Sequence, residues 1–579
     1  MVPTPLSGAR RLWPLVVLLI ALATRLWGID WQLPAALYFD ELKYVAWAGE
    51  AKGDAGAMVE DLRNPTLFHH VLQVEYAVAS AARGGASAQE AAVFELRLAR
   101  ITSAVLGALA CLLTALATSR LARAVGGLRR EALAGLSAGL VLALAPLHVH
   151  LSHYAVNDAT ASLFLATTLL FGSRALAGGS WRVLLLAGVA AGLAFSTKYS
   201  FAIGLAMPLV GALLARPGDL TPRPPLRRGE GGQEARLHPF LVGPGGRRGE
   251  IGRHVRLALL VLAGFVVGAV LGGPEIVLRP GDVIAGVAEQ ARLGSMRWNG
   301  QSDAPVWLLY AETLVQGFGW PALLTAAVGV GVLAWRGRGA LAAVLAVPLL
   351  CLAVMLRQEL YFARFALPLL PSLAMLAGIG VAGLIGFGVS GAPARSIRVM
   401  AMEVAVVLAV LGVVLLPEAL TTVRHNQLAT TTDTRLLARR WLRQRGDGAR
   451  VATEIYGQPL AWTGSEALRG FRLQRHPSFV DPGLVTRLAC EGTRYFLVAS
   501  LTSERELARR SARAGESGYD LLTRQGRAVM TFDPFWPGMS APAHPDNTGI
   551  PFWHLEAYAR PGPKITVYEL PEGAVACRG

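Results

Sequence analysis

The sequence has few charged residues for its length, and the shortage is concentrated in particular stretches. Charged residues make up 16% of the 579 residues, whereas soluble proteins carry about a quarter. Charge is missing above all from a series of apolar stretches of about 17–25 residues, the length that crosses the hydrocarbon core of a bilayer. The composition therefore excludes an ordinary soluble protein and predicts a multi-pass membrane protein.

Lysine is nearly absent, because Lys43, Lys52, Lys198 and Lys564 are the only four in the chain. Arginine therefore supplies almost all of the formal net charge of +16. A basic balance of this size is typical of proteins that bind nucleic acid, but here the arginines flank the apolar stretches. We therefore expect no nucleic acid partner, and we interpret the preference for arginine as one of codon composition.

Several kinds of catalytic and metal-binding motif are missing from the sequence. It has no glycine-rich phosphate-binding loop, no His-Glu pair of a zinc protease and no nucleophile elbow. No Cys-x-x-Cys or His/Cys spacing indicates a structural metal. Of the four cysteines, Cys111 and Cys351 lie in apolar stretches, where they resemble small apolar residues, whereas Cys490 and Cys577 lie in the C-terminal region. An oxidising compartment would permit a disulfide between the latter two, and the sequence leaves that pairing open.

Eleven apolar stretches predict membrane spans. They cover about residues 12–28, 101–118, 133–150, 156–173, 183–197, 199–215, 256–273, 319–335, 340–356, 365–388 and 399–416. The first has basic residues before it, as a cleaved signal peptide does, but no small-residue cleavage site follows. Arginines gather in alternate loops and acids in the opposite ones, so the positive-inside rule places the N-terminus in the cytoplasm. The odd number of spans then places the C-terminal region outside the cell (inner) membrane, in the periplasm.

The predicted architecture is mainly α-helical. It consists of a transmembrane bundle at 1–416 and a water-facing C-terminal domain of α/β or α+β character at 417–579. A long external loop at 29–100 has helical apolar spacing at 40–51 and 66–80, which predicts amphipathic helices on the membrane surface.

A cytoplasmic insert interrupts the predicted bundle. Residues 216–255 are rich in Pro, Gly and Arg and cannot bury a core, so we expect them to be disordered. We interpret the segment as a neutral insertion, with electrostatic contact to the anionic inner leaflet as the alternative. In the C-terminal region, apolar spacing predicts a helix at 432–445 and strands at 450–455, 495–499 and 564–570.

Ionisable residues near membrane depth are costly, so they are the first candidates for function. Asp40 and Glu41 follow the first span, and neighbouring positions on a helix do not face each other. One carboxylate can therefore point into a cavity while the other orients a partner. A carboxylate desolvated near the membrane surface would suit a general base. An ordinary solvated acidic pair in a polar loop is the simpler alternative.

Histidines occur in two external turns. His69 and its neighbour follow Arg63 and a proline turn, and adjacent histidines can bind a metal or a substrate, although surface histidines are common. His153 belongs to the hairpin between predicted spans three and four, which also contains Asp158. Asp158 would lie at the start of a span, where it can line an active site. The alternative is an N-cap of the helix by Asn157 or Asp158, and the two interpretations are compatible.

Isolated cations lie near the predicted ends of several spans. They are Arg100, Lys198, Arg357 and Arg364, and Lys198 is the only charge in 183–215. Cations that gather near headgroup depth on one face of the membrane are what a lipid-linked phosphate requires. The alternative for each is that the side chain extends to the interface without a specific partner.

The order of these motifs resembles that of the polyprenyl-phosphate-dependent glycosyltransferases of the GT-C superfamily, in particular the protein O-mannosyltransferases and the lipid A aminoarabinose transferases. The likeness covers about residues 12–390 and a strand near the C-terminus. The similar segments are Asp40-Glu41 with Tyr44, Arg100 to Gly107, Asp158 at the start of span four, Gly192 to Tyr199, Arg364 to Pro371 and Gly562 to Tyr568. The turn Asn64-Pro65-Thr66-Leu67 departs at two of four positions from the family's His-Pro-Pro-Leu pattern, so specificity cannot be carried over from any one relative.

The resemblance implies an inverting transfer of a sugar from a polyprenyl-phosphate carrier to an acceptor hydroxyl of a protein, lipid or glycan on the extracytoplasmic face. It implies Asp40 as the general base and Glu41 as a residue that orients either Asp40 or a cation. The implied donor-binding residues are Arg100, Lys198, Arg364 and Tyr361, and the implied pocket wall consists of Asp158, His153, Tyr44, Arg63 and His69. No cofactor is certain, and a divalent metal, held by Asp40 and Glu41 if by any residues, stays open.

Two other functions remain as alternatives. A transporter or flippase of an anionic lipid or solute would also gather cations near helix ends, but such proteins usually contain internal repeats, and the sequence has no evident repeat. A non-catalytic scaffold, whose exported domain binds a partner, is the second alternative.

Overall fold

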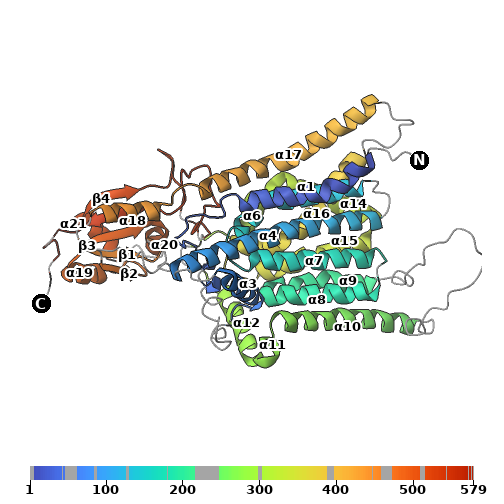
Figure 1. Ribbon diagram of the computed structural model, residues 1–579, viewed down its shortest axis with the longest axis horizontal. Coiled ribbons are helices and arrows are strands. Elements are labelled where there is room, and N and C mark those ends of the chain that lie inside the picture. Colours follow the sequence, from blue (N-terminus) through green and yellow to red (C-terminus); the bar gives the residue numbers. More distant parts are fainter. Residues whose placement is uncertain are drawn as a thin grey trace, which may run out of the picture.

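The structure is a computed structural model and describes most of the chain. The described residues are 6–38, 40–41, 43–45, 62–83, 88–125, 130–178, 180–214, 247–297, 301, 303–387, 397–445, 448–457, 472–508, 515–542, 544, 546–571, 573–575 and 577. A bundle of helices carries a smaller domain with a five-stranded sheet at one of its ends (Figure 1). The predicted fold class, a mainly α-helical membrane bundle with a C-terminal domain that contains strands, is confirmed.

The helices of the bundle run roughly side by side along its long axis (Figure 1). In chain order they are α1 (Leu6–Leu26), α4 (Ala88–Ala124), α5 (Glu131–Leu144), α6 (Pro146–Ser152), α7 (Asp158–Leu176), α8 (Trp181–Thr197), η2 (Tyr199–Leu205), α9 (Ala206–Leu214), α10 (Arg247–Gly272), α13 (Val306–Leu314), η3 (Val315–Gly319), α14 (Trp320–Arg336), α15 (Arg338–Met355), η4 (Ala363–Leu369), α16 (Leu370–Phe387) and α17 (Ile397–Ala429). The end of the bundle nearest the C-terminal domain also carries α3 (Leu67–Arg83), α11 (Glu275–Leu278) and α12 (Pro280–Gly294) (Figure 1). The predicted surface helix at 66–80 is α3, whereas much of the one predicted at 40–51 lies outside the described residues.

Among the described residues, seven helices are long and apolar enough to cross a membrane, or eight if α5 and α6, which meet at a bend of 60°, form one span. The apolar helices Leu12–Leu26, Trp181–Thr197 and Tyr199–Leu214 are shorter and occupy the places of three more predicted spans. The predicted count of eleven spans is therefore not confirmed, although each predicted span contains a helix. The difference is one of length, because a crossing needs about 20 residues of helix.

The predicted cytoplasmic insert lies outside the described residues as far as residue 246. From Arg247 the chain is helical, because α10 begins there and runs to Gly272. The predicted disorder therefore does not extend over 247–255, where the helix continues from the apolar part of α10 towards the insert.

Small residues bring α8 and α10 into backbone contact, as the glycines within the spans predict. A Cβ atom added to Gly188 would lie 2.1 Å from the carbonyl oxygen of Val261, and one added to Gly268 would lie 2.0 Å from that of Val189. Since packed interiors have no room for such contacts, an alanine at either position would force the two helices apart.

The C-terminal domain is built on a sheet with the strand order β2-β1-β3-β5-β4. Its elements are α18 (Thr434–Arg445), β1 (Arg450–Glu454), β2 (Arg472–His476), α19 (Pro482–Cys490), β3 (Thr493–Ala499), α20 (Ser500–Ala508), α21 (Gly518–Gln525), β4 (Arg527–Phe532) and β5 (Ile565–Glu569). β1 is parallel to β2 and β3, whereas β5 is antiparallel to β3 and β4. The predicted helix and the three predicted strands are confirmed as α18, β1, β3 and β5. The strands β2 and β4 were missed because they lie at the sheet edges and bury little, so their apolar alternation is weak.

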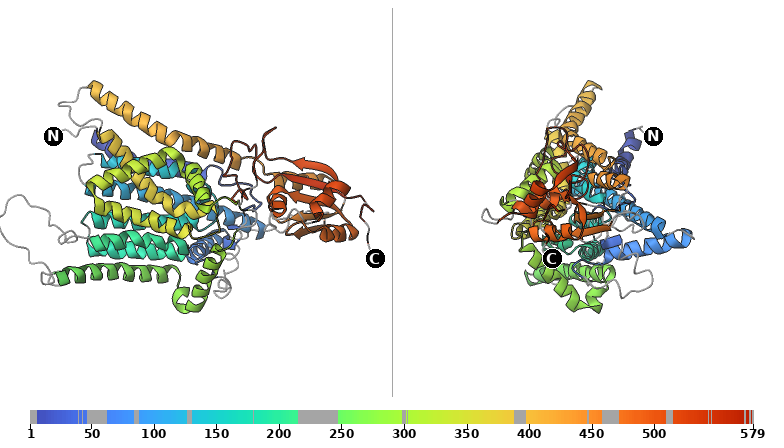
Figure 2. Two further views of the ribbon diagram at one scale, coloured as in Figure 1. Left: turned by 180° about the vertical axis from the view of Figure 1, so that it is seen from behind. Right: turned by 90° about the vertical axis from the view of Figure 1, so that its left-hand side faces the viewer.

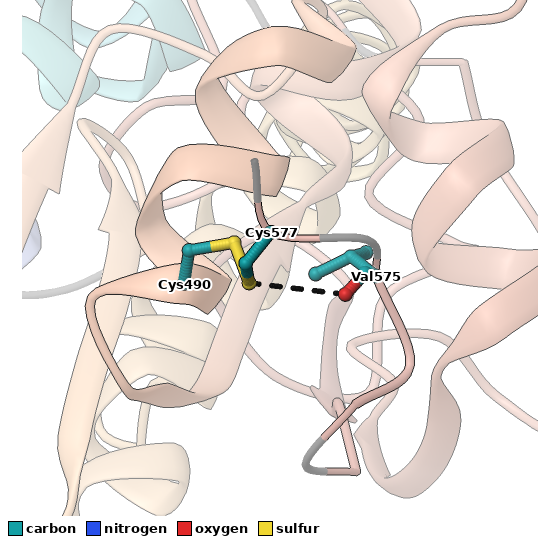
Figure 3. The surroundings of a disulfide bond; sticks show 3 residues. All are labelled: Cys490, Val575 and Cys577. Atoms are coloured by element: carbon teal, nitrogen blue, oxygen red, sulfur yellow. Dashed lines mark hydrogen bonds between the residues drawn. A yellow bond between two sulfur atoms is a disulfide. The ribbon is translucent and has the colours of Figure 1, made fainter. Parts of the chain in front are cut away.

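A disulfide joins Cys490, at the end of α19, to Cys577, with the Sγ atoms 2.02 Å apart (Figure 3). Their Cα atoms lie 5.6 Å apart, within the usual range for a disulfide. The structure therefore contains the pairing that the sequence left open, and it ties the C-terminal tail to the sheet domain. The other two cysteines, Cys111 and Cys351, are free and buried.

Polar contacts hold the joint between the bundle and the C-terminal domain, which lies over one end of the bundle (Figure 2). The Arg435 guanidinium donates to both carboxylate oxygens of Asp433, at 2.9 and 2.8 Å, and the two side chains are almost fully buried. Gln32, shortly after α1, donates to the Thr431 carbonyl oxygen at 2.6 Å and accepts from the Asp433 N–H at 3.1 Å. The predicted domain boundary at 416–417 falls inside α17, which continues to this joint.

Candidate functional site

Charged side chains from distant parts of the chain meet at the end of the bundle that carries the C-terminal domain. Asp40 follows α1, Asp158 is the first residue of α7, Lys198 follows α8, and Arg364 lies in η4. These residues lie at or next to helix ends. A charged side chain is tolerated there because it need not be buried among the apolar side chains of the helix.

Asp40 and Arg364 form an ion pair in this cluster. Arg364 Nη1 donates to Asp40 Oδ2 at 2.6 Å, and the same nitrogen lies 3.5 Å from the Tyr38 hydroxyl oxygen. Both side chains of the pair are partly exposed, Arg364 at 24% and Asp40 at 35%. The guanidinium also lies over the ring of Phe362, 4.5 Å from its centroid. A competing anion can therefore reach this pair and open it.

Glu41, the neighbour of Asp40, pairs with Arg100. Arg100 donates to both carboxylate oxygens, at 2.7 and 2.8 Å, and neither side chain is exposed. Glu41 Oε1 also accepts from the Ala155 N–H at 3.0 Å, and Arg100 also donates to the Trp31 carbonyl oxygen at 2.7 Å. The pair joins the segment after α1 to α4 and to the turn before α7. The implied role of Arg100 as a phosphate ligand stays a prediction, and in this structure its guanidinium is directed at Glu41.

Asp158 pairs with Lys198 across the hairpin of α7 and α8. Lys198 Nζ lies 2.6 Å from Asp158 Oδ1, with 20% of the lysine side chain and 6% of the aspartate side chain exposed. The side chain of Asn157 donates to the Thr197 carbonyl oxygen at 2.6 Å and makes no capping bond to α7. Asn157 therefore occupies the N-cap position of α7, one of the two alternatives, but its side chain does not cap the helix.

Arg364 connects the two ion pairs, because it interacts electrostatically with Asp158 as well as with Asp40. Tyr38 and Tyr44 lie near both aspartates. Burial raises the pKa of both tyrosine hydroxyls, and the negative charge of Asp40 adds to this, so both stay protonated and can donate hydrogen bonds. Asp40 and Lys198 therefore lie at the same end of the bundle, as a shared site requires.

Two of the predicted site residues are buried and bonded elsewhere. The ring nitrogens of His153 face the carbonyl oxygens of Val149 and Trp27, at 2.9 and 3.0 Å, which ties α6 to the end of α1. The Tyr361 hydroxyl bonds with that of Thr313 at 2.7 Å, within the bundle. Their implied roles at the substrates stay predictions.

Of the remaining predicted residues, Tyr44 is helical, His69 belongs to α3, and Arg63 lies in a turn before α3. The rings of Tyr44 and His69 lie against each other with centroids 4.9 Å apart. Burial lowers the pKa of His69 to about 3, so this imidazole is neutral. Arg63 is exposed, and its carbonyl oxygen accepts from Gln290 of α12 at 2.9 Å.

Two acids that the sequence interpretation did not select belong to this region. Glu275 lies 3.4 Å from the neighbouring histidine, His70, and accepts from the Thr66 hydroxyl at 2.7 Å. Asp546 comes from residues 533–564, the β4–β5 connection of the C-terminal domain, and its Oδ2 accepts from the Ala363 N–H at 2.9 Å. Burial raises the pKa of Asp546 to about 6, although the Ala363 N–H and the nearby Arg364 oppose this. No motif or spacing marks either acid, because both meet their partners only through tertiary packing.

The donor groups do not form an evident metal centre. Across the described ranges, no group of three or more His, Cys, Asp or Glu side chains could hold a metal ion. Asp40 and Glu41, the residues to which a divalent ion was assigned if to any, each bond to a different arginine.

Comparison with known proteins identifies a related family. Residues 91–223 match the family model of dolichyl-phosphate-mannose-protein mannosyltransferases. This segment contains Arg100, Asp158 and Lys198. A comparison with curated proteins gives no match.

Solved structures of membrane glycosyltransferases are also similar. The archaeal oligosaccharyltransferase AglB from Archaeoglobus fulgidus, in complex with an inhibitory peptide and a dolichol-phosphate, has 12% identity, a TM-score of 0.48, and coverage of 89% of this chain and 73% of its own. ArnT from Cupriavidus metallidurans, bound to undecaprenyl phosphate, has 14% identity and a TM-score of 0.44. The match covers 98% of this chain and 99% of the ArnT chain. The Pmt1–Pmt2 protein O-mannosyltransferase complex of S. cerevisiae, bound to the sugar donor, has 17% identity and a TM-score of 0.33. The match covers 49% of this chain and 35% of the yeast chain.

The family match confirms the resemblance to GT-C glycosyltransferases that the order of the motifs predicted.

Proposed function

We propose that this protein transfers a sugar from a polyprenyl-phosphate carrier to an acceptor hydroxyl, with inversion at the anomeric carbon. The observation that carries the proposal is that the partly exposed pairs Arg364–Asp40 and Lys198–Asp158 lie together at one end of the bundle. Cations at this depth suit a lipid-linked phosphate, and a carboxylate beside them suits a general base. The matched family is named for a sugar donor of the same class.

The site faces the periplasm in this proposal. Arg100 directly precedes the apolar stretch of α4 and Asp158 begins α7, whereas Arg120 and Arg174 lie near the C-terminal ends of these helices. Basic residues favour the cytoplasmic side of a membrane, so the cluster and the C-terminal domain belong on the outer side.

The donor phosphate binds Arg364 and Lys198, while the polyprenyl tail lies in the bilayer against the bundle. Arg364 is bonded to Asp40 by one nitrogen, and a phosphate can take over this contact because the pair is partly exposed. The exchange leaves Asp40 without its cation. Donor binding therefore leaves the Asp40 carboxylate free to accept a hydrogen bond from the acceptor hydroxyl.

Asp40 then removes the proton of the acceptor hydroxyl. The acceptor oxygen attacks the anomeric carbon from the side opposite the phosphate, and the bond from this carbon to the phosphate oxygen breaks. The electron pair of that bond leaves with the polyprenyl phosphate, whose charge Arg364 and Lys198 stabilise. The Glu41–Arg100 pair holds the Asp40 segment in place.

The test compares the products of cells with and without the full-length protein. Mass spectrometry of envelope lipids and glycoproteins should detect a hexose, pentose or amino-sugar increment only with the protein present. Purified Asp40→Asn, assayed with that donor and acceptor, should fold but lose a factor of about 10²–10⁴ in rate, the usual contribution of a general base.

Asp30→Asn is the matched control. Asp30 also follows α1 and pairs with an arginine, Arg97 at 2.6 Å, but its side chain is 57% exposed. Full transfer by Asp40→Asn would refute the assigned role. Unchanged envelope products together with altered movement of a lipid across the membrane would favour a transporter instead.

Chelation tests the metal. With Arg364 and Lys198 as the charges at the phosphate, dialysis against a chelator should leave the transfer rate unchanged. A loss of transfer that an added divalent ion restores would assign a metal to this site.

A further inference from the structure

We propose that the C-terminal domain completes the active site, and that Asp546 in the β4–β5 connection is a positioning residue for Arg364. This inference rests on the proposed function, because it assigns the domain a part in the same site. Asp546 acts through Ala363 and Arg364 and does not itself touch the reacting atoms.

The β4–β5 connection is built into the outer end of the bundle. Phe552 and Trp553 belong to the main hydrophobic core of the helices, and Ile550 and Leu555 belong to the core around Tyr38. None of these four residues of the connection is more than 6% exposed. This burial anchors the connection to the bundle, because returning these apolar side chains to water would be unfavourable.

The side chain of Asn547 braces the connection internally. Its Oδ1 accepts from the N–H groups of Phe552 and Trp553, at 2.8 and 3.0 Å. Its Nδ2 lies 3.2 Å from the Trp553 carbonyl oxygen and 3.2 Å from the Tyr558 hydroxyl. The neighbouring Asp546 is therefore held by a rigid turn.

A chain of contacts links the connection to Arg364. The Ile550 N–H donates to the Tyr154 hydroxyl at 2.9 Å. The Tyr154 ring is stacked on Tyr38 with centroids 3.9 Å apart, and the Tyr38 hydroxyl lies 3.5 Å from Arg364. The fit is close, because a Cβ atom on Gly549 would lie 2.6 Å from the Tyr154 hydroxyl oxygen.

Asp546 itself lies directly beside the donor-binding arginine. Its carboxylate accepts the N–H of Ala363, the residue before Arg364, and its side chain is 10% exposed. Its own N–H donates to His544 Nδ1 at 3.2 Å, and the His544 ring lies 4.5 Å from that of Trp553. The charge of Asp546 also interacts with Arg364 and Asp40.

This geometry matters when the donor enters. The phosphate draws Arg364 away from Asp40, and the guanidinium then needs another restraint to stay at the site. Asp546 supplies it by holding the Ala363 backbone and by placing a second negative charge near Arg364. Loss of Asp546 should therefore weaken donor binding more than it slows the chemical step.

The experiment uses the purified full-length protein and three variants. Asp546→Ala removes both the charge and the hydrogen-bond acceptor, whereas Asp546→Asn keeps an oxygen that can accept from Ala363. Glu556→Gln is the control, since Glu556 lies in the same connection with 75% of its side chain exposed. The measurements are KM for the donor, kcat, binding of undecaprenyl phosphate, and Tm.

Asp546→Ala should raise the donor KM and weaken undecaprenyl phosphate binding by about tenfold or more, as expected for losing a hydrogen bond to a charged group, with a smaller change in kcat. Asp546→Asn should retain part of this affinity, and Glu556→Gln should match the wild type. Unchanged donor KM in both Asp546 variants, or a loss of activity that only follows a lower Tm, would overturn the inference. Wild-type protein that neither transfers a sugar nor binds the lipid would contradict the proposed function itself.

Discussion

Asp40 and Glu41 are neighbours in the chain, yet the structure puts them in opposite situations. Glu41 is fully buried and joined to Arg100 by two hydrogen bonds, whereas Asp40 is 35% exposed and joined to Arg364 by one. A buried pair with all its bonds made holds segments together, and opening it would strand a charge. A partly exposed pair with a single bond can exchange partners. The comparison separates a structural pair from one that a ligand can open.

The largest expected effect is on the buried member of this comparison. Glu41→Gln leaves the Arg100 guanidinium buried without a negative partner, and breaking a buried pair in this way costs about 3–5 kcal/mol. We expect a low yield of folded protein and a Tm far below that of the wild type. Asp40→Asn should keep a Tm close to the wild-type value in the same detergent. Equal losses of Tm in the two variants would break the distinction.

Glu454 extends the comparison to a buried carboxylate whose partners are neutral. It accepts from the Tyr519 hydroxyl and from the N–H groups of Phe479 and Ala499. Burial raises the pKa of Glu454 to about 7. The folded state therefore binds this proton more tightly than the unfolded state, whose glutamate has a pKa of about 4.3.

The C-terminal domain should consequently lose stability as the pH rises from about 4.5 to 7, by roughly 3 kcal/mol, and lose no more above that range. Thermal unfolding of the full-length protein at pH 5 and pH 8, followed by a probe in this domain, measures the effect. In Glu454→Gln this dependence should be largely absent. A wild-type domain with the same stability at both pH values would contradict the prediction.

Replacing Arg100 or Arg364 by lysine tests the same distinction between the two pairs with a smaller expected effect. Lysine keeps the charge but cannot make two parallel hydrogen bonds. Arg100→Lys should lower Tm and leave the kinetics of the folded fraction unchanged. Arg364→Lys should raise the donor KM by about tenfold, the effect of roughly 1.4 kcal/mol, with little change in Tm. A higher donor KM in Arg100→Lys together with a lower Tm in Arg364→Lys would contradict the assignment of the two pairs.

The smallest effect is expected at the pair of His70 and Glu275. A hydrogen bond to Glu275 raises the pKa of His70 above its usual value of about 6.5. The stabilisation is therefore fully present below that value and is lost as the pH rises through the higher pKa of the folded state. His70 is 34% exposed, so solvent screening keeps the effect below about 1 kcal/mol. His70→Gln should remove this part of the pH dependence of Tm, and an unchanged dependence would contradict it.

Local patterns explain the parts of the fold that could be predicted. Apolar stretches marked helices at every predicted span, and alternation marked β1, β3 and β5, since each is a property of a few consecutive residues. The edge strands β2 and β4 bury little and left no such pattern. The number of spans could not be predicted in this way, because hydropathy gives the place of a helix and not its length within the membrane.

The candidate site divides in the same way. Asp40, Lys198 and Arg364 could be selected from the sequence, because a charge next to an apolar stretch is costly and therefore informative. Their pairing could not, since Arg364 and Asp40 are 324 positions apart. Arg100 was assigned to the phosphate by resemblance, and the packing around Glu41 gives it another partner. Asp546 lies in the β4–β5 connection, far along the chain from the last predicted span, so no apolar stretch beside it marks it as a candidate.

The sequence by itself determined that this chain forms apolar helices with ionisable residues at their ends, because the cost of burying charge in hydrocarbon acts on each segment separately. Only the tertiary structure decided which acid meets which cation, which pair is closed to solvent, and that a turn of the C-terminal domain reaches Ala363. Such choices depend on distances between segments hundreds of residues apart, and those distances exist only once the helices and the β4–β5 connection have packed.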